Sequence, residues 1–354
     1  MAVYTRSIEL QPNGLAYFSR GLLKYSYMKD LEGARDDYTQ AININPDFVV
    51  AYERRGVVRS ELGDTQGALA DYEKAIKLKP DYAEVYVGRG VVHFLLKNKK
   101  EALADYEKAI KLKPDYAEAY FALGYYYFDS KNLDAAITNL TKAISLNRNL
   151  FVAYSLRASA YYKRNDIKLN DIQNAITDFT QAIQINSDHL EAYQGRGELY
   201  SNIEDYQNAI LDFSQVIRLK SNDFQAYTKR GLAYFRINNP NFRIINLQNA
   251  LDDFNRVIQL NPNLAEAYLH RGITKLSLND YSGAVDDLTQ AIERPSSDNI
   301  CTACAYKIRG IAQSKLGNRQ GAVADLEKAA QLFREQGDMA KYQSALDLLR
   351  EVQK

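Results

Sequence analysis

The chain has 354 residues, 46% of them hydrophobic and 25% charged, which is the composition of a folded protein and not of a disordered one. Lys and Arg number 45 against 44 Asp and Glu, so no overall field would attract nucleic acid or an acidic membrane. Two cysteines exclude a disulfide framework, and neither a secretory signal nor an apolar run long enough for a transmembrane helix is visible. We therefore expect a cytoplasmic protein without membrane insertion, built as two domains or as a repeat array.

The first residues look like the end of a helical unit whose beginning is missing. Residues 2–13, AVYTRSIELQPN, resemble a second helix and its turn with no first helix before them. We interpret residues 1–13 as a partial repeat or an N-terminal cap. Either a half-repeat closes the stack, or the chain is part of a longer array. An incomplete repeat could also pair with that of a second copy, which leaves a homo-oligomer open.

From residue 14 onward one pattern returns nine times. The letters ALADYEKAIKLKPDYAE occupy residues 68–84 and recur unchanged at 102–118, a spacing of 34. Each copy has a tyrosine in the string Ala-Tyr-x-x-Arg-Gly or a close variant, followed by an alanine with Asp or Asn four residues before it. The tyrosines are Tyr17, Tyr52, Tyr86, Tyr120, Tyr154, Tyr193, Tyr227, Tyr268 and Tyr306. The Asp and Asn residues are Asp30, Asp64, Asn98, Asn132, Asp171, Asp205, Asn246, Asp280 and Asn318.

Asp and Asn are favoured N-caps, so each copy predicts a first helix, a tight turn and a capped second helix. Helices of about 20 Å cannot bury their apolar faces in one isolated hairpin, whereas stacked hairpins can. The predicted hairpins fill residues 14–336, at about 14–48, 49–82, 83–116, 117–150, 151–189, 190–223, 224–264, 265–300 and 301–336. We number them repeats one to nine.

These residues resemble the tetratricopeptide repeat family, in a variant with Tyr for the usual Trp and Arg-Gly for the usual Leu-Gly. The resemblance extends from about Leu15 to Arg334. It implies an all-α fold, a right-handed superhelical α-solenoid of about nine hairpins, whose first helices line a concave groove that binds peptides or partner proteins. Residues 337–354 are predicted to form a C-terminal capping helix, which repeat arrays require for solubility.

Two hairpin loops are longer than their counterparts. Repeat five has about five extra residues within 163–173, and repeat seven has about seven within 236–248. Insertions in surface loops cost little free energy, so they could be neutral. They could also contact a partner, and the sequence does not decide their role.

Charged residues inside the repeats predict structural ion pairs. Arg stands before the motif glycine (an alanine in repeat five) in every repeat except four, which has Leu123. Asp stands before the second-helix aromatic residue or leucine in every repeat except four again, which has Asn139. Because both exceptions fall in one hairpin, we expect the two side chains to meet within each repeat. Such pairs include Arg55 with Asp71, Arg89 with Asp105, and Arg196 with Asp212.

A candidate binding surface follows from helical spacing. Positions three before, one after and four after the motif glycine share one face of the first helix, which we call the groove stripe. An aromatic patch beside a polar one suits recognition of a partly apolar peptide or helix, although the rings could instead pack on neighbouring first helices. The predicted partner-binding residues are Phe94, Phe121, Tyr125, Phe128, Tyr162, Gln194, Glu198 and Phe235.

Catalytic and metal-binding patterns find little support. His93, His189 and His270 fall in three different repeats, and Cys301 and Cys304 lack the second pair of ligands that zinc needs. We therefore predict a protein that is not an enzyme, uses no cofactor or metal, and acts as a protein–protein interaction scaffold with a peptide or protein partner. One alternative is the substrate-recognition arm of a larger enzyme or complex whose catalytic part is absent. Another, disfavoured by the neutral charge, is an RNA-binding helical repeat protein.

Overall fold

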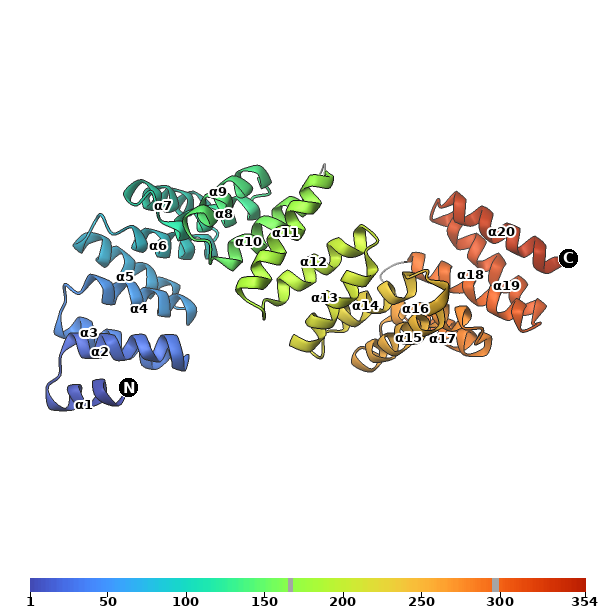
Figure 1. Ribbon diagram of the computed structural model, residues 1–354, viewed down its shortest axis with the longest axis horizontal. Coiled ribbons are helices and arrows are strands. Elements are labelled where there is room, and N and C mark those ends of the chain that lie inside the picture. Colours follow the sequence, from blue (N-terminus) through green and yellow to red (C-terminus); the bar gives the residue numbers. More distant parts are fainter. Residues whose placement is uncertain (165–167, 295–298) are drawn as a thin grey trace. The chain divides into compact units, whose positions relative to one another are not determined.

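The computed structural model describes residues 1–164, 168–294 and 299–354, with the side chains of 299–301 left out (Figure 1). All regular secondary structure in these ranges is helical, which confirms the predicted all-α class. The chain divides into two compact units, Met1–Ile185 and Asn186–Lys354, and each is described by itself.

The unit Met1–Ile185 begins with α1 (Ala2–Leu10) and continues as five helical hairpins (Figure 1). In each hairpin a first helix packs against the second helix that follows it, and the next hairpin packs on both. The hairpins are α2 (Gly14–Leu23) with α3 (Leu31–Ile44), α4 (Val49–Glu61) with α5 (Thr65–Leu78), α6 (Ala83–Leu95) with α7 (Lys99–Leu112), α8 (Ala117–Asp129) with α9 (Leu133–Leu146), and α10 (Phe151–Tyr162) with α11 (Leu169–Ile185). A π-helical turn, η1 (Lys24–Met28), continues α2.

The unit Asn186–Lys354 has the same construction and ends on one further helix. Its last helix, α20 (Met339–Gln353), packs Tyr342 and Leu346 beside the fully buried Phe333, while Met339 stays 59% exposed. The hairpins are α12 (Leu190–Asn202) with α13 (Tyr206–Leu219), α14 (Phe224–Arg236) with α15 (Arg243–Leu260), α16 (Ala265–Ser277) with α17 (Tyr281–Glu293), and α18 (Asn299–Lys315) with α19 (Arg319–Glu335). A 3-10 turn, η2 (Pro240–Phe242), precedes α15.

Most second helices begin where the cap pattern predicts. The side-chain oxygen of the cap accepts a hydrogen bond from a backbone N–H of the first turn, which satisfies one of the otherwise unpaired helix donors. Asn98 precedes α7 without such a bond. The caps with this bond are Asp30, Asp64, Asn132, Asp205, Asp280 and Asn318.

The prediction was wrong for Asp171 and Asn246, which lie inside helices. In repeats five and seven the second helix starts earlier, at Leu169 and at Arg243, so part of each insertion forms an extra helical turn. The Asp171 carboxylate instead accepts from the backbone N–H of Lys168 at 3.2 Å, as a carboxylate in the first turn of a helix often does. Residues 165–167 of the predicted loop 163–173 lie outside the described residues.

The motif glycine allows the two helices of a hairpin to approach closely. A Cβ atom built on Gly56 would lie 2.8 Å from a ring carbon of Tyr72, and one on Gly90 would lie 2.6 Å from a ring carbon of Tyr106. Both rings belong to the second helix, and both are buried, at 1% and 3% exposed. A side chain at the glycine position would therefore have to displace the largest residue of the hairpin core.

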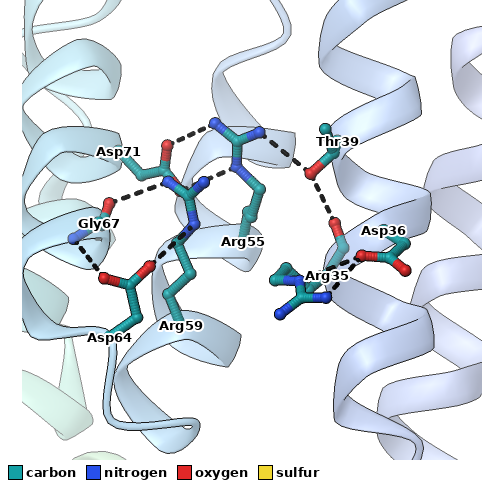
Figure 2. A network of polar contacts seen from close by, with 8 residues as sticks. All are labelled: Arg35, Asp36, Thr39, Arg55, Arg59, Asp64, Gly67 and Asp71. Carbon is teal, nitrogen blue, oxygen red and sulfur yellow. Dashed lines mark hydrogen bonds and ion pairs between the residues drawn. The ribbon is translucent and has the colours of Figure 1, made fainter.

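The motif arginine holds a buried carboxylate with two parallel bonds. In repeat two the Arg55 Nε and Nη2 donate to the two Asp71 carboxylate oxygens at 2.9 and 2.6 Å (Figure 2). The guanidinium carbon lies 5.6 Å from the ring centre of Tyr52. The third nitrogen, Nη1, donates to Thr39 of the preceding second helix at 3.2 Å. One guanidinium thus joins the helices of its own hairpin and binds that hairpin to the one before it.

The same two-pronged contact, which we call the fork, occurs in eight described hairpins, and in each the guanidinium lies over the motif tyrosine. Its nearest N–O distances run from 2.5 to 2.8 Å. The eight forks are Arg20 with Asp37, Arg55 with Asp71, Arg89 with Asp105, Arg157 with Asp178, Arg196 with Asp212, Arg230 with Asp253, Arg271 with Asp287, and Arg309 with Asp325.

The forks are electrostatically demanding because their carboxylates are buried. Asp105 is 4% exposed, and its hydrogen bond to Arg89 raises the pKa of that guanidinium. Burial raises the pKa of Asp212, which the bond from Arg196 partly opposes. Repeat two adds a second cation, since Arg59 Nη1 lies 2.9 Å from Asp71 (Figure 2). Removing the cation from such a carboxylate should cost far more than replacing the whole pair by apolar groups.

Packing between hairpins also uses the position two residues before the motif glycine. In repeat three this is Gly88, where an added Cβ would lie 2.7 Å from the Tyr72 ring of the preceding hairpin. In repeat eight it is His270, whose ring stacks on Phe254 with centroids 5.5 Å apart and 26° between planes. Burial lowers the pKa of His270, so the folded chain favours the neutral imidazole.

Replacing Arg89 with leucine should destabilise the hairpin of α6 and α7 by about 3 kcal/mol, because Asp105 would remain buried without a cation. Adding Asp105→Asn to Arg89→Leu reproduces the Leu123 and Asn139 of repeat four and should recover most of that loss. Chemical denaturation followed by circular dichroism compares the three proteins. Arg55→Leu is the matched control, because Arg59 still neutralises Asp71, and its effect should be smaller. Equal losses in the two hairpins, or no recovery in the double variant, would contradict this account.

Lowering the pH from about 7.5 to about 5.5 should destabilise the unit Asn186–Lys354. The folded-state pKa of His270 lies below its ordinary 6.5, so the unfolded chain takes up the proton first and unfolding becomes easier as the pH falls through 6.5. The pKa of His189 is lowered in the same way and acts with the same sign. His270→Ala, which copies Ala122 at the same position of α8, should therefore flatten the pH dependence measured by thermal melting. An unchanged slope would mean that other groups cause it.

Candidate partner-binding surface

The groove stripe is open to different degrees along α6, α8 and α10. Tyr125, one residue after the motif glycine, is 46% exposed, and Val91 at the same position of the neighbouring α6 is 41% exposed. Phe94, Phe121 and Phe128 are only partly exposed. On α6 and α8 the position just after the glycine therefore faces solvent more fully than the other two, whereas Ser159 of α10 is only partly exposed.

Contacts explain the difference in exposure. Phe94 packs against the cluster around Tyr106 and Leu123, and Phe121 and Phe128 pack against the cluster around Leu140. Tyr125 touches the edge of Phe94 with centroids 5.6 Å apart and 76° between planes, an edge-to-face arrangement. Three of the five predicted rings of this unit thus help to hold hairpins together, while Tyr125 exposes nearly half of its surface.

Tyr162 ends α10, and its side chain is partly exposed. Lys163, which follows it, places its ammonium 4.9 Å from the ring centre of Phe128 on the preceding hairpin. The sequence analysis did not identify Lys163 as a residue of this surface. Its position directly after a first helix could have indicated it, because a long side chain there can reach the preceding hairpin.

The remaining predicted residues belong to the unit Asn186–Lys354. Gln194 and Glu198 lie one turn apart on α12 and are partly exposed, and Glu198 forms an ion pair with Lys229 of α14. Phe235 ends α14 beneath the Arg243 guanidinium, 5.3 Å from its centre, and Arg243 also bonds the Phe235 carbonyl at 2.7 Å. Phe235 is therefore engaged with the start of α15. The structure does not place these three residues relative to the rings of α6, α8 and α10.

The predicted Arg and Asp residues lie apart from this surface. Arg55, Arg89 and Arg196 each spend two nitrogens on their own aspartate, and those aspartates are at most 4% exposed. Such guanidinium groups have little capacity left for a ligand. The sequence analysis missed the contacts made by Arg Nη1, although a polar residue two places after the aspartate of the preceding repeat, or after Asn139 in repeat four, marks them. These contacts are to Thr39, Thr141, Ser214, Asn255 and Thr289.

Within the described ranges no group of three His, Cys, Asp or Glu residues could hold a metal ion. His93 lies in α6, His189 precedes α12, and His270 lies in α16, while Cys304 lies in α18 and the Cys301 side chain lies outside the described residues. No helix in the described part of the chain is both long and apolar enough to cross a membrane.

Comparison with solved structures finds the same architecture. The match to PilF of Pseudomonas aeruginosa covers 60% of this chain and 94% of the PilF chain, with 21% sequence identity and a TM-score of 0.52. Cut9 with Hcn1, from the APC/C, matches 80% of this chain and 52% of its own, with 17% identity and a TM-score of 0.50. YrrB, described as a TPR protein with an unusual peptide-binding site, covers 53% of this chain and 95% of its own, with 23% identity and a TM-score of 0.41. No relative was found among curated proteins.

Sequence models of known families match along both units. A model described as TPR repeat matches residues 58–97, and one described as tetratricopeptide repeat matches 83–116. A further tetratricopeptide repeat model matches 16–48, 117–150, 158–189 and 190–223. Together these matches cover more than half of the chain, and they fall on the helical hairpins described above. The chain belongs to the tetratricopeptide repeat family.

Proposed function

We propose that this chain is a non-catalytic interaction scaffold that binds a peptide segment of a partner protein on the first helices α6, α8 and α10. Family membership supports a protein-interaction scaffold. The observation that favours these three helices is the exposed Tyr125, beside Val91 of the neighbouring helix and the partly exposed Phe94 and Phe128.

Exposed apolar side chains at consecutive repeats favour binding of an apolar side chain. Burying apolar surface yields roughly 25 cal/mol per Å², and a tyrosine loses little conformational entropy when it is covered. Phe94 already contacts the Tyr125 ring in an edge-to-face arrangement, so the ring is preordered for contact. The hydroxyl group can in addition bond a peptide backbone, which suits Tyr125 to a central contact.

The polar stripe of α12 suits a different role. Glu198 is already neutralised by Lys229, so it offers a partner no unpaired charge. Gln194, one turn earlier, is partly exposed, and its amide can both donate to and accept from an extended backbone. We therefore assign the apolar anchor to α6, α8 and α10 and only auxiliary polar contacts to α12.

Tyr125→Ala should abolish capture of the partner from a native cell extract, because truncation of a central aromatic contact costs about 2 kcal/mol or more, roughly thirtyfold in affinity. The melting temperature should change little, since Tyr125 is 46% exposed and makes one ring contact. Affinity capture with mass spectrometry, beside thermal melting, measures both effects. Phe128→Ala should weaken capture and also lower the melting temperature, because Phe128 packs on the Leu140 cluster.

The matched control removes rings of the same kind elsewhere. Tyr27 and Phe242 are 82% and 54% exposed and lie off the groove stripe, so Tyr27→Ala with Phe242→Ala should leave capture unchanged. If Tyr125→Ala captures the same proteins as the unaltered chain, the proposed surface is wrong. Equal losses in the control would point to a general effect of surface rings.

A further inference from the structure

A cleft of about 980 Å³ opens where the hairpins of repeats four and five end. One wall is the end of α8 and its turn into α9, and the other is formed by residues 163–164 and by the start of α11. Tyr125 and Phe128 of the groove stripe line it, so the cleft continues the proposed binding surface toward the edge formed by the hairpin turns.

Arg164 braces the two walls. Its guanidinium forms ion pairs with Asp134 in the first turn of α9 and, at 3.0 Å, with Asp171 of α11. The bond to Asp134 raises the pKa of Arg164, which stays a cation. Asp129, the third carboxylate of the cleft, is paired with Lys99 at 2.7 Å. Asp134 and Asp171 thus share one cation, Arg164, and each described carboxylate that lines the cleft contacts a cation.

Three lysines that line the cleft have no such partner. Within the described ranges, Lys131, Lys163 and Lys168 form no ion pair with an acidic side chain. Lys131 stands at the tip of the α8–α9 turn, and Lys163 lies over the Phe128 ring at 4.9 Å. The side chains of the cleft thus combine aromatic surface with a surplus of positive charge.

We propose that this cleft binds an acidic stretch of the partner peptide, with a carboxylate near the three lysines and a neighbouring apolar side chain on Tyr125 and Phe128. The proposal rests on the proposed function for the partner being a peptide. Charge complementarity carries it: the described side chains that line the cleft include four cations and three carboxylates, and each carboxylate is already bonded to an arginine or a lysine, so an anionic ligand would neutralise the excess positive charge. The aromatic surface favours a peptide over a simple anion, because a bare anion would leave both rings uncovered.

The test uses three fluorescein-labelled peptides with the same Leu-Phe core, flanked by glutamate, glutamine or lysine runs. Fluorescence anisotropy should show the glutamate peptide binding about tenfold more tightly than the glutamine peptide, with the advantage lost at high salt. In the variant Lys131→Gln/Lys163→Gln/Lys168→Gln the glutamate peptide should fall to the affinity of the glutamine peptide. The control Lys77→Gln/Lys111→Gln/Lys315→Gln removes the same charge from exposed lysines outside the cleft and should change nothing.

The outcomes separate this proposal from the proposed function. If Tyr125→Ala weakens all three peptides while the cleft-lysine variant leaves the glutamate peptide unaffected, the apolar surface stands and the acidic preference is overturned. A glutamate peptide that binds no better than the glutamine peptide also overturns it. If a single-stranded oligonucleotide binds as tightly and is lost in the cleft-lysine variant, the cleft is a general polyanion site and the commitment to peptide is wrong. Thermal melting of each variant checks that the fold is intact.

Discussion

A carboxylate buried between two helices needs a cation, and this requirement organises the hairpins of this chain. The fork from the motif arginine supplies this cation. Its geometry also determines the neighbouring residues, because the tyrosine ring lies beneath the guanidinium and the glycine lets the second helix approach. Because the third nitrogen reaches the preceding hairpin, as Arg55 reaches Thr39, the same group also sets how hairpins stack. The motif Tyr-x-x-Arg-Gly is therefore a single packing device with three coupled parts.

Repeat four shows what happens when the device is replaced. Leu123 takes the place of the arginine, is 7% exposed, and joins an apolar cluster with Phe94 and Tyr126. Asn139 takes the place of the aspartate and bonds the Ala135 carbonyl of its own helix at 2.8 Å. An apolar pair of this kind can be as stable as a buried ion pair, so the hairpin keeps its fold. It also gains apolar surface around the rings, and this is the hairpin whose stripe carries the open Tyr125.

The predictability of these features depended on whether their cause was local. The forks could be inferred because their only exception, Leu123 with Asn139, occurs at both positions of one hairpin. The helix starts at Leu169 and Arg243 could not be inferred. The inserted residues extend each helix toward its N-terminus, while Asp171 and Asn246 keep the usual position four residues before the alanine and so still look like caps. The rings were correctly placed on one helical face. Their solvent exposure could not be predicted from the repeat period, because Phe121 and Phe128 are covered by neighbouring helices that a single repeat does not contain.

The fork also determines where recognition can lie. In the eight described hairpins that contain it, the fork occupies the inward face of the first helix and engages the arginine there, which leaves the groove stripe and the turns for recognition. On the stripe the position after the glycine is apolar or aromatic from Leu22 to Tyr125 and becomes polar at Ser159, which ends the apolar run of this unit at α8. At the turns the chain can hold lysines without internal partners, as at Lys131, whose left-handed backbone (φ 61°) ends α8. A ligand that uses both regions must have apolar and acidic residues side by side. A purely apolar helix would leave the lysines of repeats four and five uncovered, and a purely acidic segment would leave Tyr125 uncovered.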